Sequence, residues 1–183
     1  LSLHDALPIY AEKDITLNVA MFLEEKTIHP DIKVLIPRIT DKELSDEERI
    51  KFAKEVGAAL YIRLGVDSLL DETDYGLEGF YNGEYFIPGF GNVDLADVFL
   101  RNTTVSVNNR AKGLTEASED SVLKAFEVPA AQIQLGNLSN EKERALLIRK
   151  DYQNLLADGL ADAIMESYGR MYPAEGTEEK RTD

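Results

Sequence analysis

The chain of 183 residues has no cysteine and only two histidines. The lack of cysteine excludes disulfides, thiolate nucleophiles and cysteine-ligated zinc. Long apolar runs are also missing, because no stretch approaches the roughly 18 to 20 apolar residues that a membrane-spanning helix needs. No signal-peptide pattern occurs either. We therefore expect no membrane-spanning segment and no chemistry that depends on a thiol.

Positive charge is scarce as well. Lysine and arginine number 20 against 34 aspartates and glutamates, which leaves a formal net charge of -14. Binding to phosphate backbones or anionic membrane surfaces needs clustered cations, so we expect no nucleic-acid partner and no binding to an anionic membrane surface. A hydrophobic content of 44% in a chain of this length fits one soluble α/β domain with its own core.

The first nine residues, LSLHDALPI, need a separate explanation. They match the translation of a widely used sequencing adapter, CTT TCC CTA CAC GAC GCT CTT CCG ATC. The final T of the adapter would begin the next codon, and every tyrosine codon, as needed for Tyr10, begins with T. We therefore expect residues 1–9 to be a read-through artefact and exclude them from the fold. His29 is then the only authentic histidine.

Helices are predicted where apolar residues recur every three or four positions. Residues 12–28 place Ile15 and Val19 on one face, with acidic residues in the first turn. Ser45 and Glu48 form a capping-box pattern in front of a second helix. Further helices are expected at residues 94–107, 118–126, 139–150, where Ser139 is the predicted N-cap, and 152–168.

Strands are predicted at residues 32–36, 58–64 and 128–135, which are short apolar runs. The glycine-rich segment 65–91 predicts a long loop with one short strand. Strands that alternate with helices favour an α/β three-layer sandwich, in which a mostly parallel twisted sheet carries helices on both faces. We expect residues 10–172 to form this domain and residues 173–183 to be a disordered tail or linker.

Four segments, in this order, carry a family resemblance. They are residues 12–17 (EKDITL), residues 34–53, residues 58–67 (AALYIRLGVD) and residues 129–140 (PAAQIQLGNLSN). They resemble the motifs E-K-D-L-T-L, V-x-L-T-R-x-x-D with R-x-x-x-A-N, A-D-L-Y-I-R-L-H-A-N and P-A-V-L-V-E-x-G-F-x-S-N of the zinc-dependent N-acetylmuramoyl-L-alanine amidases. The likeness extends over residues 11–168. Only the opening strand of the family, with its D-P-G-H-G-G signature, has no counterpart, and we expect it upstream of residue 10.

The resemblance implies a reaction and a set of positions. These amidases hydrolyse the amide between N-acetylmuramic acid and L-alanine in peptidoglycan, using zinc held by His, Glu and His and a second Glu that relays the proton. Glu12 matches the ligand glutamate. Gly65 stands in place of the second histidine, Asp67 in place of the asparagine that follows it, and Gln134 in place of the catalytic glutamate. Asp67 and Arg63 are the candidates for contact with substrate, and Arg63 is also expected to pair with a carboxylate.

These replacements predict an impaired site. Glycine offers no ligand atom, and a neutral glutamine cannot accept a proton. Loss of a general base costs roughly 10²- to 10⁴-fold in rate. The resemblance therefore predicts a pseudoenzyme of the bacterial cell wall or extracellular space that holds no zinc and serves as a peptidoglycan-binding or structural module, with other domains possible in the parent protein. The alternatives are an active zinc amidase that recruits a carboxylate such as Asp67, and a non-enzymatic regulator of an active amidase.

Other residues have both functional and structural interpretations. His29 is expected at the surface or in a cap. The acidic residues Asp67, Asp71, Glu72 and Asp74 would suit calcium through their oxygen atoms, although their spacing is not that of an EF-hand. The aromatic residues between positions 75 and 90 would either stack on sugar rings or pack the loop down.

Overall fold

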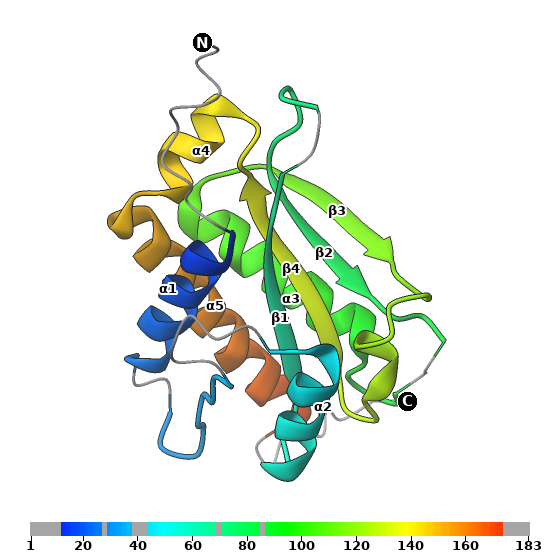
Figure 1. The fold of residues 1–183 in the computed structure, drawn as a ribbon. Helices are drawn as coiled ribbons and strands as arrows, with labels where there is room; N and C mark the ends of the chain where they lie inside the picture. The colour runs from blue at the N-terminus through cyan, green and yellow to red at the C-terminus, as the bar shows by residue number, and fades with distance from the viewer. Residues whose placement is uncertain (1–11, 27–28, 38–43, 69–70, 85–86, 174–183) are drawn as a thin grey trace, which may run out of the picture.

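A four-stranded sheet forms the centre of the molecule. The computed structural model describes residues 12–26, 29–37, 44–68, 71–84 and 87–173, so residues 1–9 and all but the first residue of the predicted tail lie outside it. The strands are β1 (Tyr61–Asp67), β2 (Leu77–Tyr81), β3 (Ala111–Glu116) and β4 (Ala130–Asn137). Their order is β1-β4-β2-β3 (Figure 1). The pairs β1–β4 and β2–β3 are parallel and β2–β4 is antiparallel, which confirms the mostly parallel sheet.

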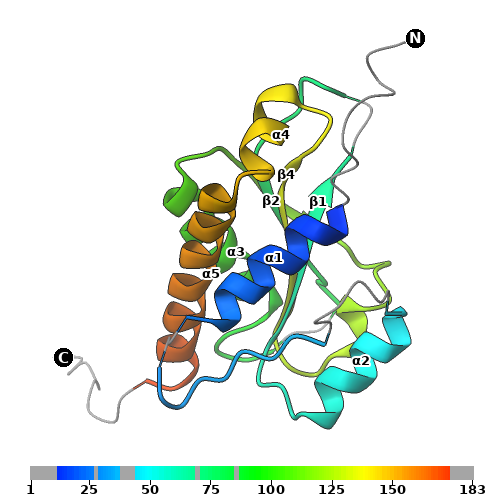
Figure 2. The ribbon, with the colours of Figure 1, turned by 60° about the vertical axis from the view of Figure 1, so that its left-hand side comes forward.

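One face of the sheet is covered by three helices that form the main core. They are α1 (Glu12–Glu24), α3 (Asn92–Val107) and α5 (Lys150–Met171), and Figure 2 shows α1 crossing in front of this layer. Ile133 and Leu135 of β4 point into this core and are fully buried. The short helix α4 (Glu141–Leu147) follows β4 at the end of the sheet.

The described helices cover only part of the opposite face. Helix α2 (Asp46–Glu55) and a 3₁₀ turn (Leu123–Ala125) lie over the amino-terminal ends of β1 and β4. Their apolar residues form a second, smaller core with Tyr61 and Phe80. Helices therefore lie on both faces, as predicted, but those of the second face leave the carboxyl ends of β1 and β4 to polar side chains. None of the described helices combines the length and the apolar character needed to cross a bilayer.

Local capping chemistry determines where several helices begin. The predicted capping box is present, since the Ser45 backbone N–H donates to Glu48 and the Glu48 N–H donates to the Ser45 hydroxyl. The helix predicted from Ser139 begins one residue later, because the Asn140 side chain accepts from the Glu143 N–H and is the N-cap. Residues 118–126 form only the 3₁₀ turn of the expected helix.

The strand prediction was wrong at three places. Residues 32–36 alternate between partly buried and exposed side chains but have no strand partner in the described part of the chain. The strand expected at 58–64 lies at Tyr61–Asp67, because Ala58 still bonds to the Ala53 carbonyl at the end of α2. The edge strand β3 was not predicted, since its sequence AKGLTE contains two charged residues and a glycine at φ +124°.

Candidate functional site

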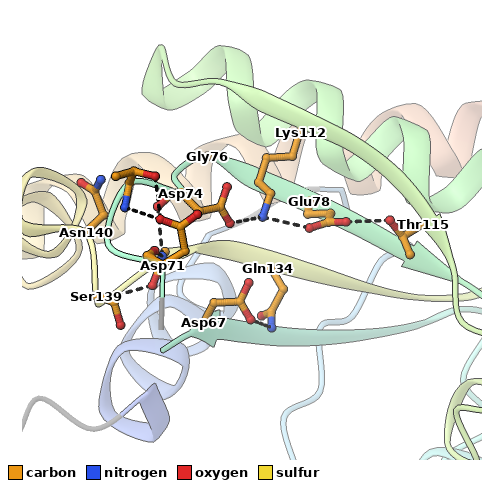
Figure 3. Close-up of polar contacts among 12 residues, drawn as sticks. Asp67, Asp71, Asp74, Gly76, Glu78, Lys112, Thr115, Gln134, Ser139 and Asn140 are labelled. Atoms are coloured by element: carbon orange, nitrogen blue, oxygen red, sulfur yellow. Dashed lines mark hydrogen bonds and ion pairs between the residues drawn. The ribbon is translucent and has the colours of Figure 1, made fainter. Parts of the chain in front are cut away.

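The half of the sheet that the described helices leave uncovered carries a row of polar side chains (Figure 3). Side chains alternate between the two faces of a strand, so those of Gln132 and Gln134 lie on the face opposite the main core. In the ladder, Gln134 is paired with Gly65 of β1 on one side and with Glu78 of β2 on the other. The structure thus brings the two positions that the resemblance singled out, 65 and 134, directly side by side.

The Gln134 carboxamide lies over Gly65. Its Nε2 donates to Oδ1 of Asp67 at 2.7 Å, and its Oε1 is buried without a hydrogen-bond partner among the described residues. A Cβ atom built on Gly65 would lie 2.0 Å from that Oε1 and 2.8 Å from Cδ. The space beside β1 that a side chain at position 65 would need is therefore already filled by glutamine.

Glu12 reaches the same place from the first turn of α1. Its Oε1 accepts from the Val66 backbone N–H at 3.2 Å, one residue beyond Gly65. The acid is exposed, as a first-turn acid would be, yet it also joins α1 to β1 at the site. Glu12 thus contacts the residue next to Gly65, and Gly65 faces Gln134, near the carboxyl ends of β1 and β4, although the three lie far apart in the chain.

Asp67 sits in an unfavourable electrostatic environment for a carboxylate. Burial raises the pKa of Asp67; the nearby Lys112 cation opposes this shift, and the carboxylates of Glu78, Glu12 and Asp74 add to it. The neutral Gln134 is the hydrogen-bond donor that contacts the Asp67 carboxylate directly. A neutral residue at position 134 therefore suits this acidic surface.

Lys112 of β3 connects the polar row to the loop in front of β2. Its Nζ lies 2.6 Å from Asp74 and 3.2 Å from Glu78, and Thr115 donates to Glu78 at 2.6 Å. Burial opposes the positive charge, but the hydrogen bonds to Asp74 and Glu78 raise the pKa of Lys112. Lys112 is thus a charged, fully engaged residue, and sequence reasoning missed it because nothing predicted β3.

The loop of residues 71–76 is held by side chains from the last residue of β4 and from the segment that follows it. The Asn137 amide donates to the carbonyls of Asp71 and Asp74 at 3.1 and 3.0 Å. Asn140 donates to the Glu72 carbonyl at 2.9 Å. The strand-to-helix segment thus positions the loop that borders the polar row, a role that its sequence alone did not reveal.

The acidic residues of this loop do not form a calcium site. Asp71 accepts from the Thr73 N–H and hydroxyl, and Asp74 pairs with Lys112. Among residues 12–26, 29–37, 44–68, 71–84 and 87–173, no three His, Cys, Asp or Glu side chains are arranged to hold a metal ion. The calcium interpretation is therefore not supported.

The described residues do not fit the zinc centre that the family resemblance implies. Glu12 stands where a ligand is expected, but Gly65 has no side chain. The Gln134 carboxamide fills the adjoining space and offers only neutral amide atoms. We therefore derive no catalytic step through a metal for these residues.

Arg63 is engaged in an ion pair, as expected. It contacts the Asp120 carboxylate and the Gln132 carboxamide. Asp120 in turn accepts from the N–H groups of Val122 and Leu123 at 3.0 and 2.9 Å. Although burial opposes the charge, these hydrogen bonds and Arg63 lower the pKa of Asp120. Arg63 thus holds the 3₁₀ turn against the sheet, and its contact with substrate stays a prediction, as does that of Asp67.

The surroundings of His29 and of the aromatic loop residues suit a structural role. The His29 ring lies 5.1 Å from that of Tyr168, and its Nδ1 accepts from the Asp31 N–H, so it is a surface residue, as expected. Phe90 is buried, whereas Tyr75 is 44% exposed beside Arg110. Residues 85 and 86 of the predicted aromatic group lie outside the described residues.

Comparisons with known proteins agree on one family. The sequence model of the N-acetylmuramoyl-L-alanine amidases matches residues 6–166. The germination-specific N-acetylmuramoyl-L-alanine amidase of Bacillus subtilis (strain 168) is 23% identical over 171 residues, which is 86% of this chain and 70% of that protein.

Two solved structures have the same fold. The catalytic domain of the amidase CwlV from Bacillus (Paenibacillus) polymyxa is 26% identical, with a TM-score of 0.78, covering 87% of this chain and 86% of that one. The amidase of Clostridium difficile 630 is 25% identical, with a TM-score of 0.80, covering 90% and 86%. Each match thus covers most of this chain.

Proposed function

Because the chain belongs to the N-acetylmuramoyl-L-alanine amidase family, we propose that it is a non-hydrolysing member that binds peptidoglycan in the bacterial cell wall or extracellular space. The observation that carries this proposal is the Gln134 carboxamide, which lies over Gly65 and bonds to Asp67. The residues of the site are together, but their chemistry is not that of a hydrolase.

The chemistry of two positions supports the loss of hydrolysis. A carboxamide is neutral at every working pH and cannot take a proton from attacking water. Gly65 provides no ligand for a metal that would polarise the scissile carbonyl. Each defect alone removes a large share of the rate, so restoring one position would leave the other defect in place.

The retained architecture supports binding. Residues 10–172 are proposed as an amidase-like domain, and it superposes on an amidase catalytic domain with a TM-score of 0.78. The polar row beside Asp67 offers carboxylates to a peptide stem, and the Arg63 side chain is 24% exposed. We propose Asp67 and Arg63 as the contacts to peptidoglycan.

A combined binding and hydrolysis experiment tests the proposal. The purified chain is expected to hold no stoichiometric zinc by mass spectrometry, to release no stem peptides from muropeptides, and to co-sediment with purified cell-wall sacculi. The double variant Asp67→Ala/Arg63→Ala is expected to lose most of the sedimentation, whereas Lys51→Ala on the exposed face of α2 should keep it. A chain that retains one zinc and releases stem peptides would overturn the proposal.

Two other functions are outcomes of the same experiment. If hydrolysis is seen and Glu12→Ala abolishes it, the chain is an active amidase that uses carboxylates; an unchanged rate would reject that version. If the chain neither cleaves nor sediments but captures a purified active amidase, it is a regulator of that enzyme.

A further inference from the structure

We infer that Gly65 and Gln134 are energetically coupled. The Gln134 side chain holds β4 against β1, so that the stability of this part of the fold does not depend on a bound metal ion. The inference goes beyond the proposed function, because it concerns how the centre is held and requires no ligand. It follows from the mismatch between the zinc site of the family and the side chains present here.

The geometry makes the two residues dependent on each other. They face each other in the β1–β4 ladder, and the carboxamide crosses Gly65 to reach Asp67 at 2.7 Å. A Cβ atom at position 65 would meet the Oε1, Cδ and Nε2 atoms of Gln134 at 2.0, 2.8 and 3.2 Å. Only a residue without a side chain leaves the path to Asp67 open.

Glycine is needed at position 65 for space and not for backbone freedom. The glycines with a positive φ are at positions 57, 76, 89, 113 and 136, and Gly65 is not among them. An alanine would therefore fit the backbone, and its obstacle is the end of a flexible side chain. We expect Gly65→Ala to be tolerated by moving the carboxamide, at the cost of its hydrogen bond to Asp67.

The stabilisation that the hydrogen bond from Gln134 to Asp67 provides is moderate. The hydrogen bond has a charged acceptor, which makes it stronger than one between neutral groups. Asp67 is half-buried, however, and the buried Oε1 of Gln134 has no partner in the described part of the chain, so part of the gain is offset. The expected effect is a shift of a few degrees in the unfolding temperature.

A double-mutant cycle on the full chain tests the coupling. Gln134→Ala is expected to lower the unfolding temperature by about 2 to 6 °C in the native background. In the Gly65→Ala background, where the hydrogen bond is already lost, the same change should lower it by less than about 1 °C. Gly65→Ala should also shift the side-chain amide NMR signals of Gln134. Additive losses in the cycle, with unshifted amide signals, would overturn the inference.

A matched glycine and a chelator complete the experiment. Gly169 has open space around its Cβ position and no positive φ, so Gly169→Ala should leave the effect of Gln134→Ala unchanged. Addition of EDTA should leave the unfolding temperature of the native chain unchanged. If EDTA lowers it and Gln134→Ala does not, a metal holds this centre and the inference fails. All these measurements report stability, so their outcome does not depend on whether the chain binds sacculi.

Discussion

At the scale of single residues, position 134 decides the character of the site. A glutamine and a glutamate differ by one terminal group, yet only the glutamine donates to Asp67 without charge at every pH, whereas a glutamate must first be protonated. Burial and the carboxylates of Glu78, Glu12 and Asp74 already raise the pKa of Asp67, against the effect of Lys112. A second carboxylate at this point would face the Asp67 carboxylate directly.

The variant Gln134→Glu is therefore expected to make stability depend on pH. Two adjacent carboxyls raise the pKa of one of them in the folded state. The folded protein then binds a proton more tightly than the unfolded chain does, so its stability relative to the native protein is greatest near or below the ordinary carboxyl value of about 4. This stability is lost as the pH rises through the raised pKa. Urea unfolding from acidic to neutral pH measures the effect.

Gln132→Glu provides the control for this prediction. It makes the same change two residues earlier on the same face, but there the new carboxylate would meet Arg63, which already donates to Gln132. Its stability should not fall with rising pH relative to the native protein. Parallel pH profiles for the two variants would contradict the argument from local charge.

At the scale of secondary-structure elements, Glu143 joins parts of the chain that the sequence keeps apart. The residue is 3% exposed, and its carboxylate accepts from the Gly76 N–H at 3.1 Å, the Asn137 N–H at 2.7 Å and the Asn109 amide at 2.8 Å. It thereby links α4 to the end of β4, the start of β2 and the segment after α3. In the sequence it looks like an ordinary first-turn acid.

Glu143→Gln is expected to lower the free energy of unfolding by about 2 to 4 kcal/mol, because a carboxamide NH₂ would face N–H donors that now bond to a buried carboxylate. Chemical denaturation measures the loss. Glu141→Gln, an exposed change in the same helical turn, should stay within about 0.5 kcal/mol of the native protein. Equal losses in the two variants would indicate a helix-dipole effect and not the buried hydrogen bonds.

At the scale of the whole molecule, the net charge of -14 limits how the domain meets its partner. Peptidoglycan stems and cell-wall polymers also carry anionic groups, so long-range electrostatics oppose the encounter that we propose. Binding must then come from short-range contacts at the polar row of the sheet. Salt screens long-range repulsion between exposed charges far more than it weakens partly buried contacts.

Co-sedimentation with sacculi is accordingly expected to hold or rise as salt increases from about 0.01 to 0.15 M, over which the Debye length falls from about 30 to 8 Å. Binding to double-stranded DNA should be undetectable across this range. A steep loss of sacculus binding with salt would contradict the prediction, because it would indicate attraction through a basic patch.

The fold was predicted best where local chemistry decides it. The capping box of Ser45 and Glu48 and the apolar face of α1 are both formed. The errors concern pairing over long distances in the chain. Residues 32–36 have the alternation of a strand without a ladder partner in the described structure, and β3 is a strand because β2 lies beside it.

The sequence by itself determined which chemistry is possible at the site, since residue type alone denies a ligand atom to position 65 and a proton acceptor to position 134. Only the tertiary structure decided that Gln134 fills the space over Gly65, that Asp67 is its partner, and that Lys112 and Glu143 hold the surrounding strands and loop. The physical reason is the distance along the chain over which each kind of interaction acts. Capping and periodicity act within a few residues, whereas these contacts exist only after sheet pairing has brought distant segments together.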